Sequence, residues 1–277
     1  MPAIDAHQHF WKFDPVRDSW ITDDMSDIQR DFMPEDLEPL LQKHELDGCV
    51  VVQSDQSEDE TLFQVGNAAK HAFIKGVVGW TDLRAANIET RLSEYSQYNK
   101  LKGFRHVLQG EEDRALMLQP DFKRGIAALR QYGFTYDILI FPDQLKYSKE
   151  LVAAFPDQPF VIDHIAKPGI KAGIIDGWKE DMQAIAQHEN VYCKISGMVT
   201  EADWKNWKEK DFHPYLDTVV EAFGTARIMF GSDWPVCQVA GGYDKMLGIV
   251  QKYFSSFSAG EQALFFGGNA ASFYQLK

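Results

Sequence analysis

Residues 48–53, Gly48-Cys49-Val50-Val51-Val52-Gln53, form a short and continuous apolar run, which is typical of a strand covered on both faces of its sheet. Similar runs recur along the whole chain and bring the number of predicted strands to eight. The other seven are Ala3–His7, Ile74–Trp80, Leu101–Val107, Phe134–Ile140, Phe160–Ile165, Val191–Ser196 and Arg227–Phe230.

Segments with helical spacing of apolar residues lie between most of these runs. They are Pro34–His44, Thr61–Ala72, Ile88–Tyr98, Phe122–Tyr132, Ile175–Gln187 and Tyr215–Phe223. Alternation of strand and helix indicates parallel pairing through right-handed crossovers. Eight such units in 277 residues predict an α/β protein, a closed (β/α)8 TIM barrel forming one domain over residues 1–277. A doubly wound open sheet is the rival fold, but no Gly-x-Gly-x-x-Gly follows the first run.

Composition narrows the class of protein. Hydrophobic residues make up 45% of the chain, enough for a large core, yet no apolar run is long enough to span a membrane. The 41 acidic residues exceed the 28 basic ones, and the formal charge of −13 disfavours nucleic acid and anionic lipid as partners. The start MPAIDAHQHF lacks the features of a secretory signal, so we expect a cytoplasmic protein. Cys49, Cys193 and Cys237 imply no disulfide framework, and we assign Cys237 no role.

Two long connections are candidates for covering the mouth of the barrel. The segment from Phe10 to Phe32 is too long for an ordinary strand-to-helix loop and contains Trp11 and Trp20. Lys167–Gly177 is the second candidate. At the other end of the chain, Ala259–Tyr274 is predicted to form a closing helix, with Gly267, Gly268 and Asn269 as a break or cap.

The first strand ends with His7 and His9, which the period of two places on the same side. Two such imidazoles can ligate one divalent ion, or polarise a carbonyl oxygen without a metal. A His-x-His pair is a weak signal alone, since a chance or surface pair gives the same pattern. Its position at a strand end, where barrel enzymes have their sites, favours the functional interpretation.

Two further strand ends have residues suited to the same site. Asp163 and His164 directly follow an apolar run, and a charge there needs a partner or water. One of them should face the lumen, although His164 could instead cap its strand. Asp233 follows the last strand in Gly231-Ser232-Asp233-Trp234-Pro235, where a carboxylate can act as general base toward water. The alternative for Asp233 is a turn residue before Trp-Pro.

These motifs together resemble the amidohydrolase superfamily, and more narrowly its branch of sugar-lactone hydrolases. The resemblance extends over the whole chain and combines several short motifs. They are His7-Gln8-His9, Asp163-His164-x-x-Lys167-Pro168, Lys194-Ile195-Ser196-Gly197, Phe230-Gly231-Ser232-Asp233-Trp234-Pro235 and Gly268-Asn269-Ala270.

The resemblance implies a barrel that hydrolyses a lactone to a hydroxy acid. His7, His9 and His164 would contact the carbonyl oxygen or a metal, and Asp233 would activate water. The fuller superfamily pattern has a metal-bridging Lys or Glu on strand four and a His on strand five. Those strands here contain Gly103-Phe104-Arg105-His106 and Thr135-Tyr136-Asp137-Ile138, so a binuclear centre is not expected.

At most one divalent metal is therefore expected, held by His7, His9, His164 and Asp233, with zinc as one option and no metal as the other. Without a metal, a lactone oxyanion needs other positive groups. The candidates are Arg105, His106, Lys167 and Lys194, each of which could instead belong to an ordinary ion pair.

Aromatic residues near strand ends could pack on a sugar ring or simply fill the core; they are Trp11, Trp80, Tyr136 and Trp234. Four histidines in helix-like segments are interpreted as surface residues, namely His44, His71, His188 and His213.

The leading functional hypothesis is hydrolysis of an aldonolactone in sugar-acid catabolism. The resemblance alone implies the sugar, such as that of L-fucono-1,5-lactone or L-rhamnono-1,4-lactone. The expected partner is this small molecule, with neither nucleic acid nor membrane, and a homo-oligomer stays open. The alternatives are a lactonase for aromatic degradation products, a metal-dependent decarboxylase of the same superfamily, and a lactone-binding protein without turnover.

Overall fold

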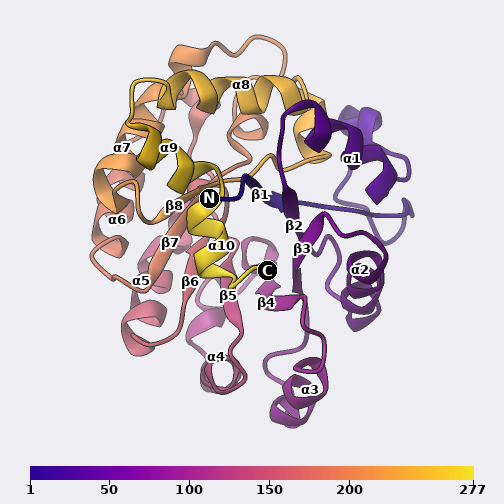
Figure 1. Ribbon diagram of the computed structural model, residues 1–277. Coiled ribbons are helices and arrows are strands. Elements are labelled where there is room, and N and C mark those ends of the chain that lie inside the picture. Colours follow the sequence, from indigo (N-terminus) through magenta and orange to yellow (C-terminus); the bar gives the residue numbers. More distant parts are fainter.

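Eight parallel strands form the centre of the molecule in the computed structural model, which describes residues 1–277 (Figure 1). They are hydrogen-bonded in sequence order, so each strand lies beside the next one along the chain. Their bounds are β1 Ile4–Gln8, β2 Gly48–Val52, β3 Ile74–Gly79, β4 Leu101–His106, β5 Thr135–Ile138, β6 Phe160–Ile162, β7 Val191–Ile195 and β8 Ile228–Phe230. The predicted (β/α)8 barrel is confirmed. The predictions for β2 to β7 extend one to three residues past the observed strand ends, most of all in β6, whereas β1 continues one residue beyond its prediction.

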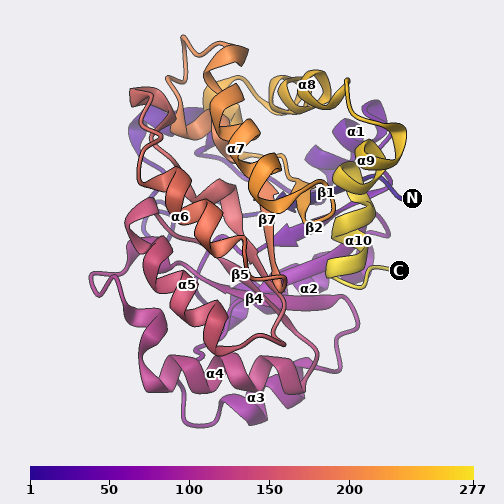
Figure 2. The ribbon, with the colours of Figure 1, turned by 90° about the vertical axis from the view of Figure 1, so that its left-hand side faces the viewer.

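Helices surround the strands and cover their outer faces (Figures 1 and 2). The eight that follow the strands are α1 Pro34–Lys43, α2 Glu58–Lys70, α3 Ile88–Tyr95, α4 Pro120–Gln131, α5 Leu145–Ala154, α6 Trp178–Ile185, α7 His213–Phe223 and α8 Tyr243–Phe254. Sequence patterns identified all of them except α5 and α8. No helix has both the length and the apolar character needed to cross a membrane.

Closure of the barrel between β1 and β8 takes place at the carboxyl ends of these strands. The backbone N–H of His9 donates to Trp234 O at 2.7 Å, and that of Asp233 donates to His7 O at 2.8 Å. These bonds surround a parallel bridge between Gln8 and Trp234. The residues that close the barrel are thus the same ones that the sequence predicted for the site.

The C-terminal segment closes the opposite end of the barrel. It consists of α9 Ala259–Ala263, a π-helical turn at Leu264–Gly268, and α10 Asn269–Phe273, as the predicted closing helix with a glycine break requires. Gly267 lies so close to the first strand that a Cβ atom there would stand 2.0 Å from Pro2 O. Both chain ends lie beside α10 (Figures 1 and 2).

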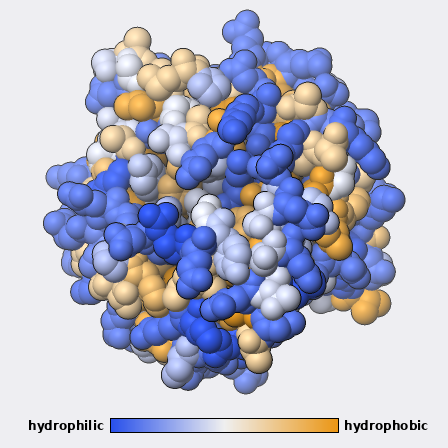
Figure 3. All heavy atoms as spheres, turned by 60° about the horizontal axis from the view of Figure 1, so that its bottom comes forward, coloured by the Kyte–Doolittle hydropathy of each residue, from blue (hydrophilic) through white to orange (hydrophobic).

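Apolar side chains fill the lower part of the barrel. They come from five strands and pack against α10; the cluster is Ile4, Ala6, Val50, Val52, Val78, Val161, Met229, Ala270, Phe273 and Tyr274. A larger cluster lies between the strands and the outer helices, which explains why the strand sequences are apolar without alternation. The surface seen in Figure 3 is mostly hydrophilic with scattered apolar residues.

A β-bulge in β1 redirects the side chains near its end. Asp5 pairs with Cys49 and Gln8 pairs with Val51, so β1 has one more residue than β2 between these pairs. Below the bulge Ile4 and Ala6 point into the barrel, whereas above it His7 takes the inward position. The bulge therefore changes the order of inward residues from even to odd positions, a change that sequence periodicity cannot predict.

The connection from Phe10 to Phe32 is tied at its base by an antiparallel bridge between Trp11 and Phe32, whose two backbone hydrogen bonds are both 2.9 Å long. The indole of Trp11 also donates to Arg30 O at 2.9 Å. We call residues 12–31 the mouth segment. It contributes Arg17, Trp20 and Met25 to the lining of the cavity at the barrel mouth, as predicted.

The end of α1 offers a test of local backbone conformation. Glu45 is exposed and has a φ of 55°, and Leu46 N donates to Leu41 O as in a Schellman motif. Glycine adopts this conformation without steric cost, so Glu45→Gly should raise the free energy of unfolding by about 1 kcal/mol. Equilibrium urea unfolding would measure it. Glu45→Ala is the matched control, and an equal gain in that variant would contradict the conformational explanation.

Candidate active site

A cavity of about 430 Å³ opens at the carboxyl ends of the strands. Its walls contain four of the six predicted catalytic residues, His9, Arg105, His164 and Asp233. His7 lies directly beneath them and is fully buried. The other lining residues come from loops that follow the strands and from the mouth segment, including Gln56, Gln109, Lys167, Glu201 and Trp204.

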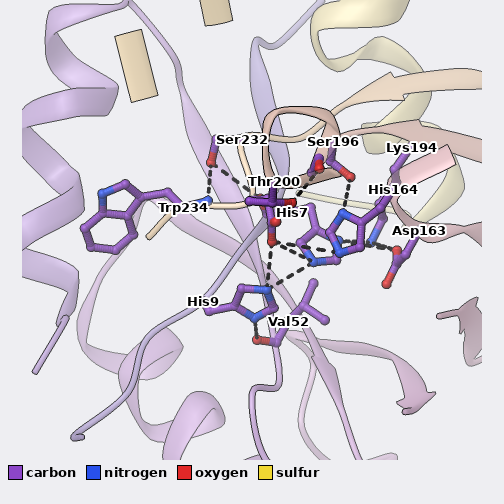
Figure 4. Close-up of polar contacts among 12 residues, drawn as sticks. His7, His9, Val52, Asp163, His164, Lys194, Ser196, Thr200, Ser232 and Trp234 are labelled. Atoms are coloured by element: carbon purple, nitrogen blue, oxygen red, sulfur yellow. Dashed lines mark hydrogen bonds and ion pairs between the residues drawn. The ribbon is translucent and has the colours of Figure 1, made fainter. Parts of the chain in front are cut away.

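Three imidazoles meet at the floor of this cavity (Figure 4), and the carboxylate of Asp233 lies beside them. We call His7, His9, His164 and Asp233 the histidine cluster. The Oδ1 atom of Asp233 is 3.3 Å from His9 Nε2 and 3.9 Å from the Nε2 atoms of His7 and His164. His7 Nε2 and His9 Nε2 are 3.2 Å apart. The tertiary structure thus brings together residues from β1, β6 and β8 as predicted.

Hydrogen bonds behind two of the rings orient them. His9 Nδ1 lies 2.8 Å from Val52 O, and since a carbonyl only accepts, this nitrogen is the donor. His164 Nδ1 contacts Ser196 Oγ at 2.9 Å (Figure 4). Each ring therefore presents its Nε2 atom toward Asp233.

Burial and charge act in opposite directions on the titratable groups of the cluster. Burial lowers the pKa of His7 and that of His164 well below 6.5, which favours neutral imidazoles. Burial also acts to raise the pKa of Asp233, but the imidazoles of His164 and His9 outweigh it, and the net pKa lies below its usual 3.8. The Asp233 carboxyl group is therefore ionised at neutral pH, and burial disfavours the charged forms of His7 and His164.

Close backbone packing holds the ring of His164 in place. Residues His164, Ile165, Ala166 and Lys167 all have positive φ angles between 48° and 58°, so the chain turns sharply after β6. A Cβ atom on Gly197 would lie 2.5 Å from His164 Nδ1. Glycine is thus required in the Ser196-Gly197 motif because the imidazole packs directly against it.

Four charged side chains lie beneath the cluster inside the barrel. We call Arg105, Asp137, Asp163 and Lys194 the buried ion group. Lys194 Nζ is 2.5 Å from Asp137 Oδ2 and 3.0 Å from Asp163 Oδ1, and Arg105 Nη1 is 3.0 Å from Asp163 Oδ2. Two cations balance two carboxylates, as complete burial demands. Lys194 is inaccessible to a substrate, unlike Arg105, which lines the cavity.

His106 does not join the histidine cluster. On β4 Arg105 faces the lumen, so its neighbour His106 faces outward toward α4. There His106 Nε2 contacts Glu111 Oε1 at 2.6 Å, and the indole of Trp80 approaches His106 Nδ1 at 3.4 Å. The prediction that His106 assists at the carbonyl therefore has no geometric support, because strand alternation allows only one of the two residues to point inward.

The aromatic lining of the cavity also differs from expectation. Trp11, Trp234 and Tyr136 are buried in the core, and none of them or Trp80 lines the cavity. Trp20 and Trp204 line it instead. Trp20 belongs to the predicted mouth segment, whereas Trp204 lies in the long connection after β7 that the sequence analysis did not single out. The remaining histidines, His44, His71, His188 and His213, lie away from the cavity.

Every cation in the cavity wall has a carboxylate partner. The Arg17 guanidinium donates to both oxygens of Asp18. Lys167 Nζ lies 3.7 Å from Glu201 Oε1. Arg105 is paired within the buried ion group. The cavity therefore contains no uncompensated positive charge for an anionic ligand.

The histidine cluster has the donor types and spacing of a mononuclear metal site. Ligand atoms of His7, His164 and Asp233 all lie within 4.8 Å of one another, and His9 Nε2 is near two of them. Tetrahedral ligands about 2.0 Å from zinc are about 3.3 Å apart, close to several of these separations. No second set of ligands lies on β4 or β5, where Arg105 and Asp137 are paired in the buried ion group.

Comparisons with known proteins agree with this geometry. Residues 4–276 match the family model described as amidohydrolase. A curated L-fucono-1,5-lactonase of Burkholderia multivorans is 38% identical, with 99% of this chain and 96% of the relative covered. A second L-fucono-1,5-lactonase, from Burkholderia ambifaria, is 34% identical, with 99% and 95% covered. The crystal structure of an amidohydrolase from Burkholderia multivorans with bound zinc has a TM-score of 0.97 at 38% identity, and both chains are covered completely.

Asp5 connects barrel closure to the position of His7. Its Oδ1 accepts from the backbone N–H groups of Ser232 at 2.9 Å and His7 at 3.1 Å, and its Oδ2 accepts from Tyr243 OH at 3.0 Å. Burial raises the pKa of Asp5 to about 6, against the lowering effect of these hydrogen bonds.

Replacement of Asp5 by Ala leaves three buried donors without an acceptor, and it should cost about 3 kcal/mol of unfolding free energy. Tyr243→Phe removes one of these donors and should cost about 1 kcal/mol. Chemical denaturation of both variants would measure the difference. Similar losses in the two variants would argue against the role of Asp5 at the two backbone donors.

Proposed function

The chain belongs to the amidohydrolase family, and from this premise we propose that it hydrolyses a sugar lactone to the open-chain aldonate. L-Fucono-1,5-lactone is the first candidate because two relatives with this activity align over nearly the whole chain. The observation that best supports the proposal is the Asp233 carboxylate, which faces the three imidazoles of the histidine cluster at the floor of an accessible cavity.

In the proposed reaction Asp233 accepts a proton from water while the water oxygen adds to the lactone carbonyl carbon. The carbonyl π electrons move to oxygen and form an oxyanion. Collapse of this intermediate breaks the bond to the ring oxygen, which takes the proton back from Asp233 and becomes a hydroxyl group. Water is consumed, and the product is a hydroxy acid. The lowered pKa of Asp233 agrees with this role because the base must be ionised beforehand.

The oxyanion requires hydrogen-bond donors that point into the cavity. Arg105 is the strongest candidate among the cationic residues, because it lines the cavity and its Nη1 atom lies 3.3 Å from His7 Nε2 in the histidine cluster. Lys167 lines the cavity near the rim, and Lys194 is fully buried, so both are less suited to direct contact.

A divalent metal would be held by His7, His9, His164 and Asp233, whose nitrogen and oxygen donors suit zinc. A bound zinc ion would supply Lewis acidity toward the carbonyl oxygen. The relative with bound zinc supports this option.

Charge balance in the cavity favours a neutral lactone. Arg17, Arg105 and Lys167 are each paired with a carboxylate, so a substrate with several carboxylates would lack cationic partners. This favours an aldonolactone over lactones from aromatic degradation. Trp20 and Trp204 offer apolar faces for a sugar ring.

The first test is acid release from a panel of L- and D-aldonolactones, measured with a pH indicator, with and without chelator. Asp233→Asn should lower kcat by about 10³-fold or more because the amide cannot accept the proton from water. Its circular dichroism and melting temperature should match those of the wild type. An Asn variant with near-native turnover would exclude this role of Asp233, and no acid release from any aldonolactone would count against the proposed function.

The pairing of Lys167 with Glu201 predicts a change of specificity. Glu201→Gln leaves Lys167 without its carboxylate, so a lactone that has one carboxylate should gain about tenfold in kcat/KM relative to a neutral lactone. The ratio for the two substrates is the measurement. Adding Lys167→Gln in the same chain should cancel the gain. An unchanged ratio in Glu201→Gln would mean that this pair does not set the charge preference.

A further inference from the structure

Three consecutive polar residues line the cavity, and the proposed reaction uses none of them. They are Ser54, Asp55 and Gln56, in the loop between the end of β2 and the start of α2. We call residues 54–56 the β2 turn. A few well-placed polar groups in a cavity wall fix the orientation of a small ligand and provide specificity. The β2 turn is therefore a candidate for contact with the part of a substrate that does not react.

Hydrogen bonds to the first turn of α2 hold the backbone of the β2 turn. Glu60 Oε1 accepts from the backbone N–H and from the hydroxyl group of Ser54, each at 3.3 Å. The same oxygen accepts from Gln64 Nε2 at 2.8 Å, and both Glu60 and Gln64 are buried. On the other side of the turn, Ser57 Oγ accepts from Glu60 N at 3.2 Å. This support preorganises the turn, which lowers the entropic cost of binding a ligand.

One hydrogen bond sets the direction of the Gln56 amide group. Its Oε1 atom accepts from the backbone N–H of Val107, just after β4, at 2.8 Å. A backbone N–H only donates, so the amide oxygen and not the nitrogen occupies this contact. The NH2 group of Gln56 makes no hydrogen bond within the protein, and the residue is exposed and lines the cavity. Its two N–H donors are thus available to a ligand.

The carboxylate of Asp55 is also without a partner. It forms no ion pair and accepts no hydrogen bond within the protein, and this half-buried residue lines the cavity. Nearby cations of the cavity wall pair with other carboxylates, Arg17 with Asp18 and Lys167 with Glu201. A carboxylate only accepts hydrogen bonds, and one carboxylate offers too few ligands for a dedicated divalent cation site. The groups of a neutral lactone that suit Asp55 are therefore hydroxyl groups.

We propose that Asp55 and Gln56 determine substrate specificity by binding the hydroxyl groups of a lactone ring. Asp55 accepts from neighbouring hydroxyl groups, and the NH2 group of Gln56 donates to a hydroxyl oxygen. A polyhydroxylated ring has the donors and acceptors that this pair requires, whereas a lactone with several carboxylates would place like charges beside Asp55. The inference rests on the proposed function for the identity of the substrate, but binding of the ring is testable without turnover.

The first test compares two neutral lactones, L-fucono-1,5-lactone with ring hydroxyl groups and δ-valerolactone without them. Asp55→Asn should lower kcat/KM for the hydroxylated lactone about 10- to 100-fold, because hydrogen bonds to a charged group are lost, and change that for δ-valerolactone less than about twofold. An unchanged ratio of the two values would overturn the proposal. Absence of turnover of any lactone by the wild type would instead count against the proposed function, and the binding measurement below would then decide on Asp55.

Two substitutions of Gln56 separate contact with a ligand from support of the loop. Gln56→Glu retains an oxygen for the Val107 N–H group but has no N–H donor, whereas Gln56→Met removes both. If the NH2 group binds a ring hydroxyl, both variants should lose about tenfold in kcat/KM for L-fucono-1,5-lactone relative to δ-valerolactone. A wild-type ratio in Gln56→Glu would mean that Gln56 acts only through Val107, and it would overturn the role proposed for the amide group.

The second test needs no hydrolysis. 1,5-Anhydro-L-fucitol has the hydroxylated ring without the carbonyl group, and calorimetry measures its Kd. Asp55→Asn should weaken its binding about tenfold or more. The matched control is Asp59→Asn, which removes the charge of a nearby exposed carboxylate that does not line the cavity and should retain the wild-type Kd. No binding to the wild type, or the same Kd in Asp55→Asn, would overturn the proposal.

Discussion

The ion pairs of Lys194 with Asp137 and Asp163 are the interactions on which the rest of the barrel interior depends. A charge buried at 0% exposure is tolerated only when it is fully paired, and removal of one partner typically costs about 3–5 kcal/mol. These pairs divide the lumen into an apolar lower part and a polar upper part. Tyr274, which directly follows α10, donates to Asp137 Oδ2 at 2.8 Å. This hydrogen bond connects the C-terminal segment, which closes the bottom of the barrel, to the buried ion group.

Closure of the barrel and assembly of the site use the same backbone. The bond from Asp233 N to His7 O sets the distance between the proposed base and one of its imidazoles, and Asp5 secures both strands from outside. The bulge in β1 supplies the change of direction that brings His7 inward. Barrel closure and the geometry of the proposed site therefore depend on the same hydrogen bonds.

The polar side chains of the cavity are more buried and more closely hydrogen-bonded at the floor than at the mouth. At the mouth, Trp20 and Trp204 provide apolar surface, and Lys167 is balanced by Glu201. At the floor, the Asp233 carboxylate faces three imidazoles, and hydrogen bonds behind the rings orient His9 and His164.

The sequence alone was sufficient for the barrel and for the four residues of the histidine cluster. Short apolar runs alternating with helical patterns depend on local side-chain burial, and His7, His9, His164 and Asp233 stand at strand ends, which a parallel barrel brings to one face. Tertiary structure decided the rest. It turned Arg105 inward and His106 outward, buried Trp11, Tyr136 and Trp234, brought Trp204 to the cavity, and placed Lys194 under His7. Those outcomes depend on a bulge, on loop paths and on pairing between residues such as Lys194 and His7 that are 187 positions apart, and local sequence patterns contain no information about such contacts.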